Sequence, residues 1–196
     1  MMEIAELGQS LLKFAGALDS IQVSWAIGGA LASAVHGEPR STNNVDVIAQ
    51  LSDAQVRALV ARLGDDFYAS EDAAVDAVRR RASFNVIDNA TLVKIDIFVP
   101  PPGPMGVGQL ERARRVAVFA GLAAVPMLGP EDVVLQKLRW YRLGGEVSDR
   151  QWRDVVSVLR LLGERADRAY LEQVASGEGL GELLRRAQED AGVDGG

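Results

Sequence analysis

The chain has 196 residues, of which 48% are hydrophobic and 24% charged, as is usual for a globular protein. It contains no cysteine and one histidine, which excludes disulfides, thiolate zinc sites and cysteine nucleophiles and leaves carboxylates as ligands for hard ions such as Mg²⁺. The net charge of −6 disfavours strong duplex-DNA binding, because neutralisation of phosphates by basic residues supplies most of that affinity.

Strand and helix patterns are mixed through the first two thirds of the chain. Apolar residues at helical spacing between Ile4 and Leu18 predict an amphipathic first helix. Short apolar runs predict strands at 22–27, 45–49, 67–70, 83–88, 91–99, 115–119 and 123–128. Helical patterns lie between them at 30–35, 53–63, 71–81 and 106–112, and Ser52 is the expected N-cap of the second.

The last third is predicted to be helical. Pro130 and the two acids after it are typical of a helix start, and this helix ends at Gly144. Ser148 and Gln151 have the capping-box spacing that opens the next helix, and two more are expected at 166–175 and 180–191. The sequence therefore predicts an α+β fold, with a mixed-sheet core at 1–128 and a helical region at 129–196 packed on it.

Neither a signal peptide nor a membrane span is evident in the sequence. The first ten residues lack a basic segment followed by an apolar run, and no stretch is long and apolar enough to cross a bilayer. We therefore expect a cytoplasmic protein with no membrane partner.

Polar residues at three points of the predicted core point to one chemistry. Gly28 and Gly29 lie between a strand and a helix, where backbone N–H groups can approach a phosphate. Asn44 and Asp46 are two residues apart in the next strand, so their side chains face the same way. Asp96 interrupts another apolar strand. Such positions on neighbouring strands would hold Mg²⁺ over a triphosphate.

These segments in this order resemble the polymerase-β-like nucleotidyltransferases, whose pattern is a glycine turn, a helix, an Asp-x-Asp strand and a later third acid. They are most similar to the bacterial AbiEii/MenT-like branch, in which Arg-x-Thr-x-Asp-φ-Asp follows the glycine turn. Here that segment reads Arg40-Ser-Thr42-Asn-Asn44-Val-Asp46. The later segments Pro130-Glu-Asp132 and Ser148-Asp-Arg150-Gln-Trp152-Arg-Asp154 also fit the branch, so the resemblance covers about 25–154.

The resemblance implies a nucleotidyltransferase-type core and Mg²⁺-dependent transfer of a nucleoside monophosphate from an NTP. The positions it implies are metal ligands Asn44, Asp46 and Asp96; nucleotide contacts Gly28, Gly29, Arg40, Thr42 and Lys137; and catalytic residues Asp46, Asp96, Lys137 and Asp154. Lys137 would neutralise phosphate charge, and Asp154 would orient Lys137 or the acceptor. Several members of this branch are toxins that act on tRNA and pair with an antitoxin, so tRNA or another RNA acceptor and a cognate antitoxin are the implied partners.

Asn44 departs from the family pattern, which has an acid at this position. A neutral amide still offers an oxygen to Mg²⁺ but removes one negative charge, so we expect weaker metal binding. Three interpretations stay open: an enzyme that works with Asp46 and Asp96 alone, a non-catalytic relative, and an engineered Asp→Asn change.

Each candidate also has a structural interpretation. The alternatives are an ion pair of Asp46 with Arg40 or another basic residue, an ion pair of Asp96 with Lys94, a Lys137 that covers apolar surface, and a surface pair of Asp154 with Arg150. His36 is expected to pack or cap at a helix end. Trp25, Trp140 and Trp152 are expected in the core, with base stacking as an alternative for Trp140 or Tyr141. The basic runs 79–81 and 114–115 suit either RNA or a solvated surface.

Two other classes of protein compete with the enzyme. A non-enzymatic module would keep the nucleotide pocket, or only a partner surface, for regulation, and Asn44 favours it. An interaction protein of unrelated fold would make the ordered pattern accidental. Placement of Asn44, Asp46 and Asp96 on separate faces would exclude both nucleotide-based interpretations.

Overall fold

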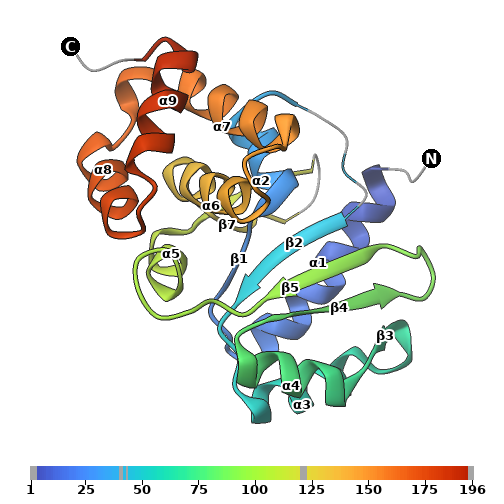
Figure 1. Cartoon of the computed structure of the whole chain (residues 1–196). Coiled ribbons are helices and arrows are strands. Elements are labelled where there is room, and N and C mark those ends of the chain that lie inside the picture. The colour runs from blue at the N-terminus through green and yellow to red at the C-terminus, as the bar shows by residue number, and fades with distance from the viewer. Residues whose placement is uncertain (1–3, 40–41, 43, 120–122, 194–196) are drawn as a thin grey trace.

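The computed structural model describes residues 4–39, 42, 44–119 and 123–193. Within them one mixed sheet runs through the centre of the core (Figure 1). Its strands are β1 (Trp25–Ile27), β2 (Asn44–Ala49), β3 (Phe67–Ala69), β4 (Ser83–Asp88), β5 (Lys94–Phe98), β6 (Arg114–Val116) and β7 (Val125–Met127). They lie in the order β3-β4-β5-β2-β1-β7-β6. The pairs β2–β5 and β1–β7 are parallel and the other pairs are antiparallel.

Helices flank this sheet and make up the last third of the chain. Those of the first part are α1 (Ile4–Ser20), α2 (Gly29–His36), α3 (Asp53–Leu63), α4 (Glu71–Arg80) and α5 (Val107–Arg112). Those of the last part are α6 (Pro130–Leu143), α7 (Asp149–Leu162), α8 (Arg168–Gly177) and α9 (Gly181–Ala191). The short 3-10 turns Gly64–Asp66 and Gly163–Arg165 follow α3 and α7. The predicted α+β class, with flanking helices and a C-terminal helical bundle, is confirmed.

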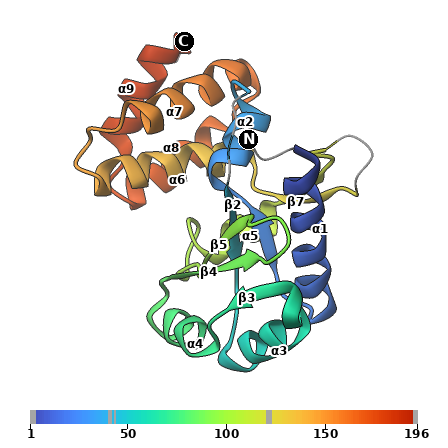
Figure 2. The same ribbon diagram turned by 90° about the vertical axis from the view of Figure 1, so that its right-hand side faces the viewer.

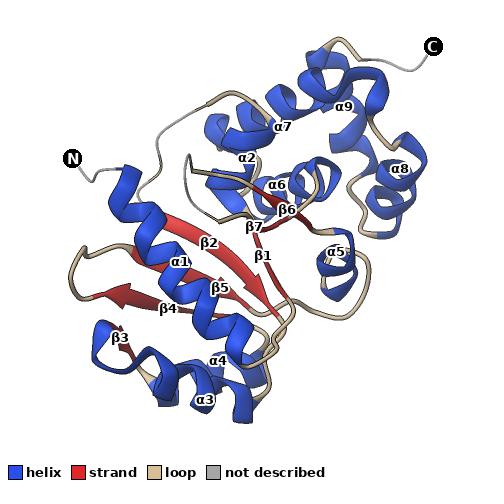
Figure 3. Ribbon diagram, turned by 180° about the vertical axis from the view of Figure 1, so that it is seen from behind, coloured by secondary structure: helices blue, strands red, loops and turns tan. Residues whose placement is uncertain are grey.

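The two faces of the sheet differ because side chains alternate along each strand. Val45, Val47 and Ile95 point to one face and are fully buried. Helix α1 crosses the back of the sheet and supplies core residues such as Phe14 and Leu18 (Figure 3). The opposite face of β2 and β5 carries the polar residues of the predicted site. This alternation places the predicted site on the face that α1 leaves open.

The C-terminal helices pack on the core through α2. Helix α6 contacts α2, α7 and α8, and α7 contacts α2 and α9, so the helical region stands at one end of the sheet (Figure 2). Arg112 of α5, Asp132 of α6 and Tyr170 of α8 form a hydrogen-bonded cluster, with the Arg112 guanidinium 3.9 Å from the Tyr170 ring centroid. Burial raises the pKa of Asp132 to about 6, against the opposing effect of Arg112. The predicted division of the chain at 128/129 stays a prediction.

Several strands are shorter than predicted. Gln22 has a φ of 54° and Leu92 a φ of 59°, in the left-handed region that an extended strand does not use. Strand β1 therefore begins at Trp25 and β5 at Lys94, later than the predicted starts at 22 and 91. Strands β6 and β7 are also shorter, at three residues each. Local backbone conformation, which hydrophobic pattern does not reveal, sets these ends.

The predicted starts of α3, α4 and α6 are confirmed, whereas α5, α8 and α9 begin one or two residues later than predicted, at Val107, Arg168 and Gly181. Ser52 makes a full capping box with Gln55 at the start of α3. Ser148 accepts a hydrogen bond from the Gln151 backbone, but the side-chain oxygen of Gln151 is buried without a partner among the described residues. The box at α7 is therefore half formed. No helix in the described part of the chain is both long and apolar enough to cross a membrane.

Candidate functional site

Asp46 and Asp96 lie side by side on neighbouring parallel strands. In the register of β2 and β5 the two residues are direct partners, and Asn44 is the partner of Lys94. Because alternate residues share a face, these four side chains point to the open face of the sheet. The arrangement that would have excluded a nucleotide site, with Asn44, Asp46 and Asp96 on separate faces, is not found.

The glycine turn is built around the carboxylate of Asp46. Gly29 has a φ of 55°, and a Cβ built on it would overlap the carboxyl group of Asp46. The Asp46 Oδ2 accepts a hydrogen bond of 3.1 Å from the backbone N–H of Ala30, in the first turn of α2. The backbone N–H of Gly28 donates to the carbonyl of Asp46 at 2.9 Å. Gly28 and Gly29 thus allow the start of α2 to pack closely against β2, and this packing holds the Asp46 carboxylate in place.

The electrostatics of the two carboxylates differ. Burial raises the pKa of Asp46, and the nearby Asp96 raises it further, against the Ala30 hydrogen bond and the positive charges of Lys137 and Lys94. Asp96 pairs with Lys94 at 2.7 Å, which is the ion pair that the sequence offered as its structural interpretation. Lys94 therefore places a positive charge beside the candidate metal position.

Lys137 and Asp154 form a buried ion pair between α6 and α7. The Lys137 Nζ lies 2.8 Å from the Asp154 Oδ2, and their side chains are 8% and 9% exposed. The alternative of a Lys137 that covers surface with its ammonium in water is wrong, because the ammonium group is buried. The alternative of Asp154 as a surface residue is wrong for the same reason. Lys137 also lies close enough to Asp46 to lower its pKa.

The oxygen ligands on this face of the sheet suit a weak binding site for a divalent cation. The described residues contain no group of three or more acidic, histidine or cysteine side chains that could hold a metal. Mg²⁺ is nevertheless commonly held by one or two carboxylates and the phosphates of a substrate. Asp46 and Asp96 supply two carboxylates and Asn44 a neutral oxygen, so the residues fit a metal that arrives with a triphosphate.

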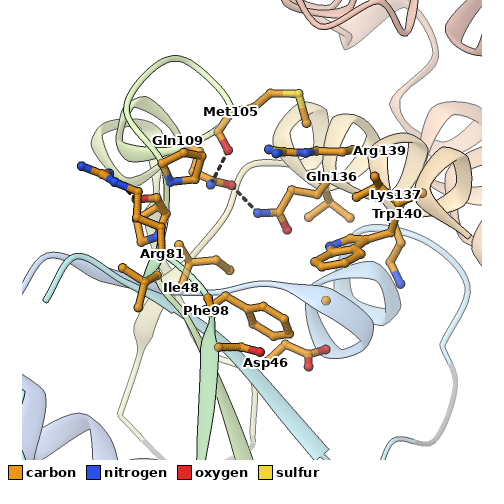
Figure 4. A pocket seen from close by; sticks show the side chains of 18 of the residues that line it. Asp46, Ile48, Arg81, Phe98, Met105, Gln109, Gln136, Lys137, Arg139 and Trp140 are labelled. Atoms are coloured by element: carbon orange, nitrogen blue, oxygen red, sulfur yellow. Dashed lines mark hydrogen bonds between the residues drawn. The ribbon is translucent and has the colours of Figure 1, made fainter. Parts of the chain in front are cut away.

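A cavity of about 480 Å³ opens beside Asp46, between the sheet and α6 (Figure 4). Its lining includes Gly29, Asp46 and Lys137, with the apolar residues Ile48, Phe98, Val99, Met105, Trp140 and Leu143. Basic residues Arg81 and Arg139 also line it. The cavity thus joins an apolar, aromatic space to the glycine turn and to positive charge, which is a suitable combination for a nucleotide.

The cavity changes the interpretation of the tryptophans. Trp140 is 48% exposed, so its prediction as a core residue is wrong. Its ring meets that of Phe98 edge to face at a centroid distance of 5.9 Å. Trp25 is buried as predicted, while Trp152 is half-buried and its ring packs at a tilt against that of the buried Tyr141. Only Trp140, of the two residues considered for base stacking, lines the cavity.

Other sequence candidates have local roles or fall outside the described residues. Arg40 is outside them, so its contacts with Asp46 or a nucleotide stay predictions. The Thr42 hydroxyl donates to the Asn44 carbonyl at 3.0 Å and shapes the entry to β2. The His36 Nε2 donates to the Leu128 carbonyl at 2.8 Å, which confirms a packing role at the end of α2.

The basic residues 79–81, which precede β4, make ion pairs and hydrogen bonds at the protein surface. Arg79 pairs with Asp53 and Arg80 with Asp76, and Arg81 donates to the Pro100 carbonyl at 3.2 Å. These contacts fit the interpretation of a solvated helix end. They leave Arg81 at the rim of the cavity.

Sequence reasoning missed the cavity residues contributed by other segments. Phe98, Gln109 and Gln136 are ordinary strand and helix residues in the sequence, and the folding of β5, α5 and α6 brings them together. The one signal of these residues in the sequence was Gln136, a polar amide within the amphipathic pattern of α6.

The sheet order, the glycine turn and the helical region together define a nucleotidyltransferase-type fold. The chain is similar to an antigenic nucleotidyltransferase-like protein from Paracoccidioides brasiliensis, at TM-score 0.58 and 19% identity over 98% of this chain and 95% of that one. It is also similar to the antibiotic-resistance factor ANT(2'')-Ia, at TM-score 0.54 and 16% identity over 92% and 96% of the two chains.

A third similar structure comes from Thermotoga maritima and was assigned to the nucleotidyltransferases. It has TM-score 0.51 and 16% identity, and the match covers 77% of this chain and 94% of that one. No protein-family model and no curated protein matches the sequence. At these identities the likeness establishes the fold.

Proposed function

We propose that this protein is a Mg²⁺-dependent nucleotidyltransferase that moves a nucleoside monophosphate from an NTP to an acceptor. The observation that carries the proposal is the direct pairing of Asp46 with Asp96, next to the glycine turn and the cavity. Two carboxylates beside a glycine turn suit phosphoryl transfer, in which catalysis depends mainly on positioning and charge stabilisation. The nucleotidyltransferase-type fold supports this reaction class.

In this proposal each residue acts on the triphosphate or on the attacking group. Asp46 and Asp96, with the Asn44 oxygen, would hold Mg²⁺, which supplies charge stabilisation at the phosphates. The acceptor hydroxyl attacks the α-phosphorus, pyrophosphate leaves, and the hydroxyl proton passes to Asp96. Its side chain is 20% exposed and therefore accessible.

The remaining positions bind and orient the nucleotide. Gly28 and Gly29 contact the bound nucleotide, with Arg40 and Thr42 as further contacts. Lys137 balances phosphate charge and is held in place by Asp154. The similarity to the AbiEii/MenT-like branch suggests tRNA or another RNA as acceptor and a toxin-like role with a cognate antitoxin.

The experiment that tests this function is calorimetry with each NTP, with and without Mg²⁺, on the protein and on Asn44→Asp. We expect weak, Mg²⁺-sensitive binding that tightens in the variant, because a third carboxylate strengthens the metal site. Gln50→Glu, at the exposed residue that follows β2, is the charge-matched control and should leave binding unchanged. Absence of NTP binding by both the protein and Asn44→Asp would exclude the proposal.

A second candidate is a nucleotide-binding module without transfer activity. Two observations favour it: Asn44 removes an acid, and Lys94 already pairs with Asp96. Transfer of labelled nucleotide to bulk RNA separates the two candidates. Labelled RNA supports the enzyme, whereas NTP binding without labelling, also in Asn44→Asp, supports the module.

A further inference from the structure

Two glutamines form a chain of hydrogen bonds in the wall of the cavity. The Gln109 Nε2 donates to the Met105 carbonyl at 2.9 Å, and the Gln136 Nε2 donates to the Gln109 Oε1 at 2.6 Å (Figure 4). Both glutamines line the cavity, and Gln109 is buried at 2% exposure whereas Gln136 is half-buried. The chain links the loop after β5, helix α5 and helix α6.

The orientation of the Gln109 and Gln136 side-chain amides follows from the hydrogen bond between Gln109 and the Met105 carbonyl. A backbone carbonyl only accepts, so the Gln109 amide must turn its NH₂ group towards Met105 and its oxygen towards Gln136. Gln136 must then turn its own NH₂ group towards Gln109. Its oxygen is left on the side of Gly28, and it accepts no hydrogen bond from any residue that the structure describes. The cavity therefore presents a fixed acceptor with no donor beside it on the same amide.

Aromatic rings face the same cavity. Phe98 and Trp140 line it together with Gln136, and the half-exposed indole of Trp140 stands at the rim. Aromatic side chains of this kind hold nucleobases by stacking, which tolerates every base. Selection among bases then depends on polar atoms in the wall.

We propose that Gln136, oriented by Gln109, selects adenine or cytosine nucleotides through the exocyclic amino group of the base. The amino group of adenine or cytosine donates to the Gln136 oxygen. A carbonyl at the same place, as in uracil or hypoxanthine, sets two acceptors against each other and leaves both unpaired. This inference rests on the proposed function, since it assigns the cavity to the base of the bound NTP. Gln136 is the specificity-determining residue and Gln109 a positioning residue.

Matched nucleotide pairs isolate this contact from ring size. ATP and ITP are both purine nucleotides and differ by an amino group and an oxo group at one carbon, and CTP and UTP make the same comparison for pyrimidines. Calorimetry on the full chain with Mg²⁺ should show a preference of about tenfold for the amino member of at least one pair, as expected for one hydrogen bond gained against an unpaired acceptor. Equal affinity within both pairs would overturn the inference.

Two variants test the assignment to the glutamines. Gln136→Leu should bring the preference to within about twofold, because the acceptor is gone. Gln109→Leu removes the partner that fixes the amide, so Gln136 can rotate and offer its NH₂ group. The preference should then fall or reverse towards ITP or UTP. Gln173→Leu, the same change at an exposed position of α8, is the control and should keep the preference.

The affinity ratio, and not the total affinity, is the measured quantity. A loss of stability would weaken both members of a pair equally, so a purely structural role of Gln109 would leave the ratio unchanged and overturn its positioning role. A preference that survives Gln136→Leu would overturn the assignment to that residue. If neither the protein nor Asn44→Asp binds any NTP, the proposed function fails. If it binds all NTPs equally, only this inference fails.

Discussion

Gly29 occupies the position from which any side chain would displace the carboxylate of Asp46. The residue lies in the left-handed region with a φ of 55°, and a Cβ on it would overlap that carboxyl group. The same carboxylate is held by the backbone N–H of Ala30 at the start of α2. The turn therefore needs glycine for two independent reasons, its backbone conformation and the approach of β2.

Gly29→Ala should impair both the site and the fold. The left-handed conformation costs a residue with a Cβ about 1–2 kcal/mol, and the methyl group must push Asp46 away from Ala30. We expect a lower midpoint of urea denaturation and loss of Mg²⁺-dependent NTP binding.

Gly16→Ala is the control, because nothing lies within 4 Å of a Cβ built at this position. It should stabilise helix α1 by about 0.5–1 kcal/mol. Unchanged NTP binding by Gly29→Ala would contradict the role of the turn.

Lys137→Met should be strongly destabilising. Removal of one partner leaves the Asp154 charge buried, which typically costs about 3–5 kcal/mol. The double variant Lys137→Met, Asp154→Leu should recover part of that loss, because it removes both members of the buried ion pair. The double variant should bind NTP more weakly than the wild type does, since Lys137 also acts on Asp46. Denaturation curves measure the stability and calorimetry the binding, and recovery of both in the double variant would argue against a role for Lys137 at the nucleotide.

Lys94→Met should strengthen Mg²⁺-dependent NTP binding. The Lys94 ammonium pairs with Asp96 at 2.7 Å and competes with a metal for that carboxylate. A half-exposed ion pair is worth about 0.5–1 kcal/mol, so we expect a gain of about two- to fivefold. Arg62→Met removes a positive charge from an exposed position of α3 and serves as the control. Weaker binding in Lys94→Met would instead identify Lys94 as a direct phosphate contact.

Asp88 should make the stability of the protein depend on pH. Burial by itself raises its pKa, but hydrogen bonds from Ser10, Ala90 and Thr91 and the charge of Lys13 hold the pKa below its ordinary value. A lowered folded-state pKa gives stability that is present above the unfolded pKa of about 3.9. That stability is lost as the pH falls through the folded value.

Asp88→Asn should remove this contribution. We expect the variant to be about 1–3 kcal/mol less stable than the wild type near pH 7. The difference should shrink as the pH falls below about 4. Urea denaturation across this range measures it, with Asp65→Asn at an exposed position as the control. A difference that stays constant with pH would mean that the charge of Asp88 contributes nothing.

The sequence predicted the α+β class because its local signals agree with the fold. The start of α6 at Pro130, the cap of α3 at Ser52 and the break at Gly144 are set by residues adjacent in the chain. The alternation along β2 likewise places Asn44 and Asp46 on one face without knowledge of the neighbours. Such features depend on the chain's own geometry.

Only the tertiary structure decided which partners these residues meet. The register of β2 against β5 puts Asp46 beside Asp96, 50 positions later, and the packing of α6 on α7 buries Lys137 with Asp154. The exposure of Trp140 and the hydrogen bond from Gln136 to Gln109 arise where α6 meets α5, a helix from a separate part of the chain. Periodicity tells which way a side chain faces along its own element. Long-range packing decides which residues of other elements that side chain contacts, and it leaves no local pattern in the sequence.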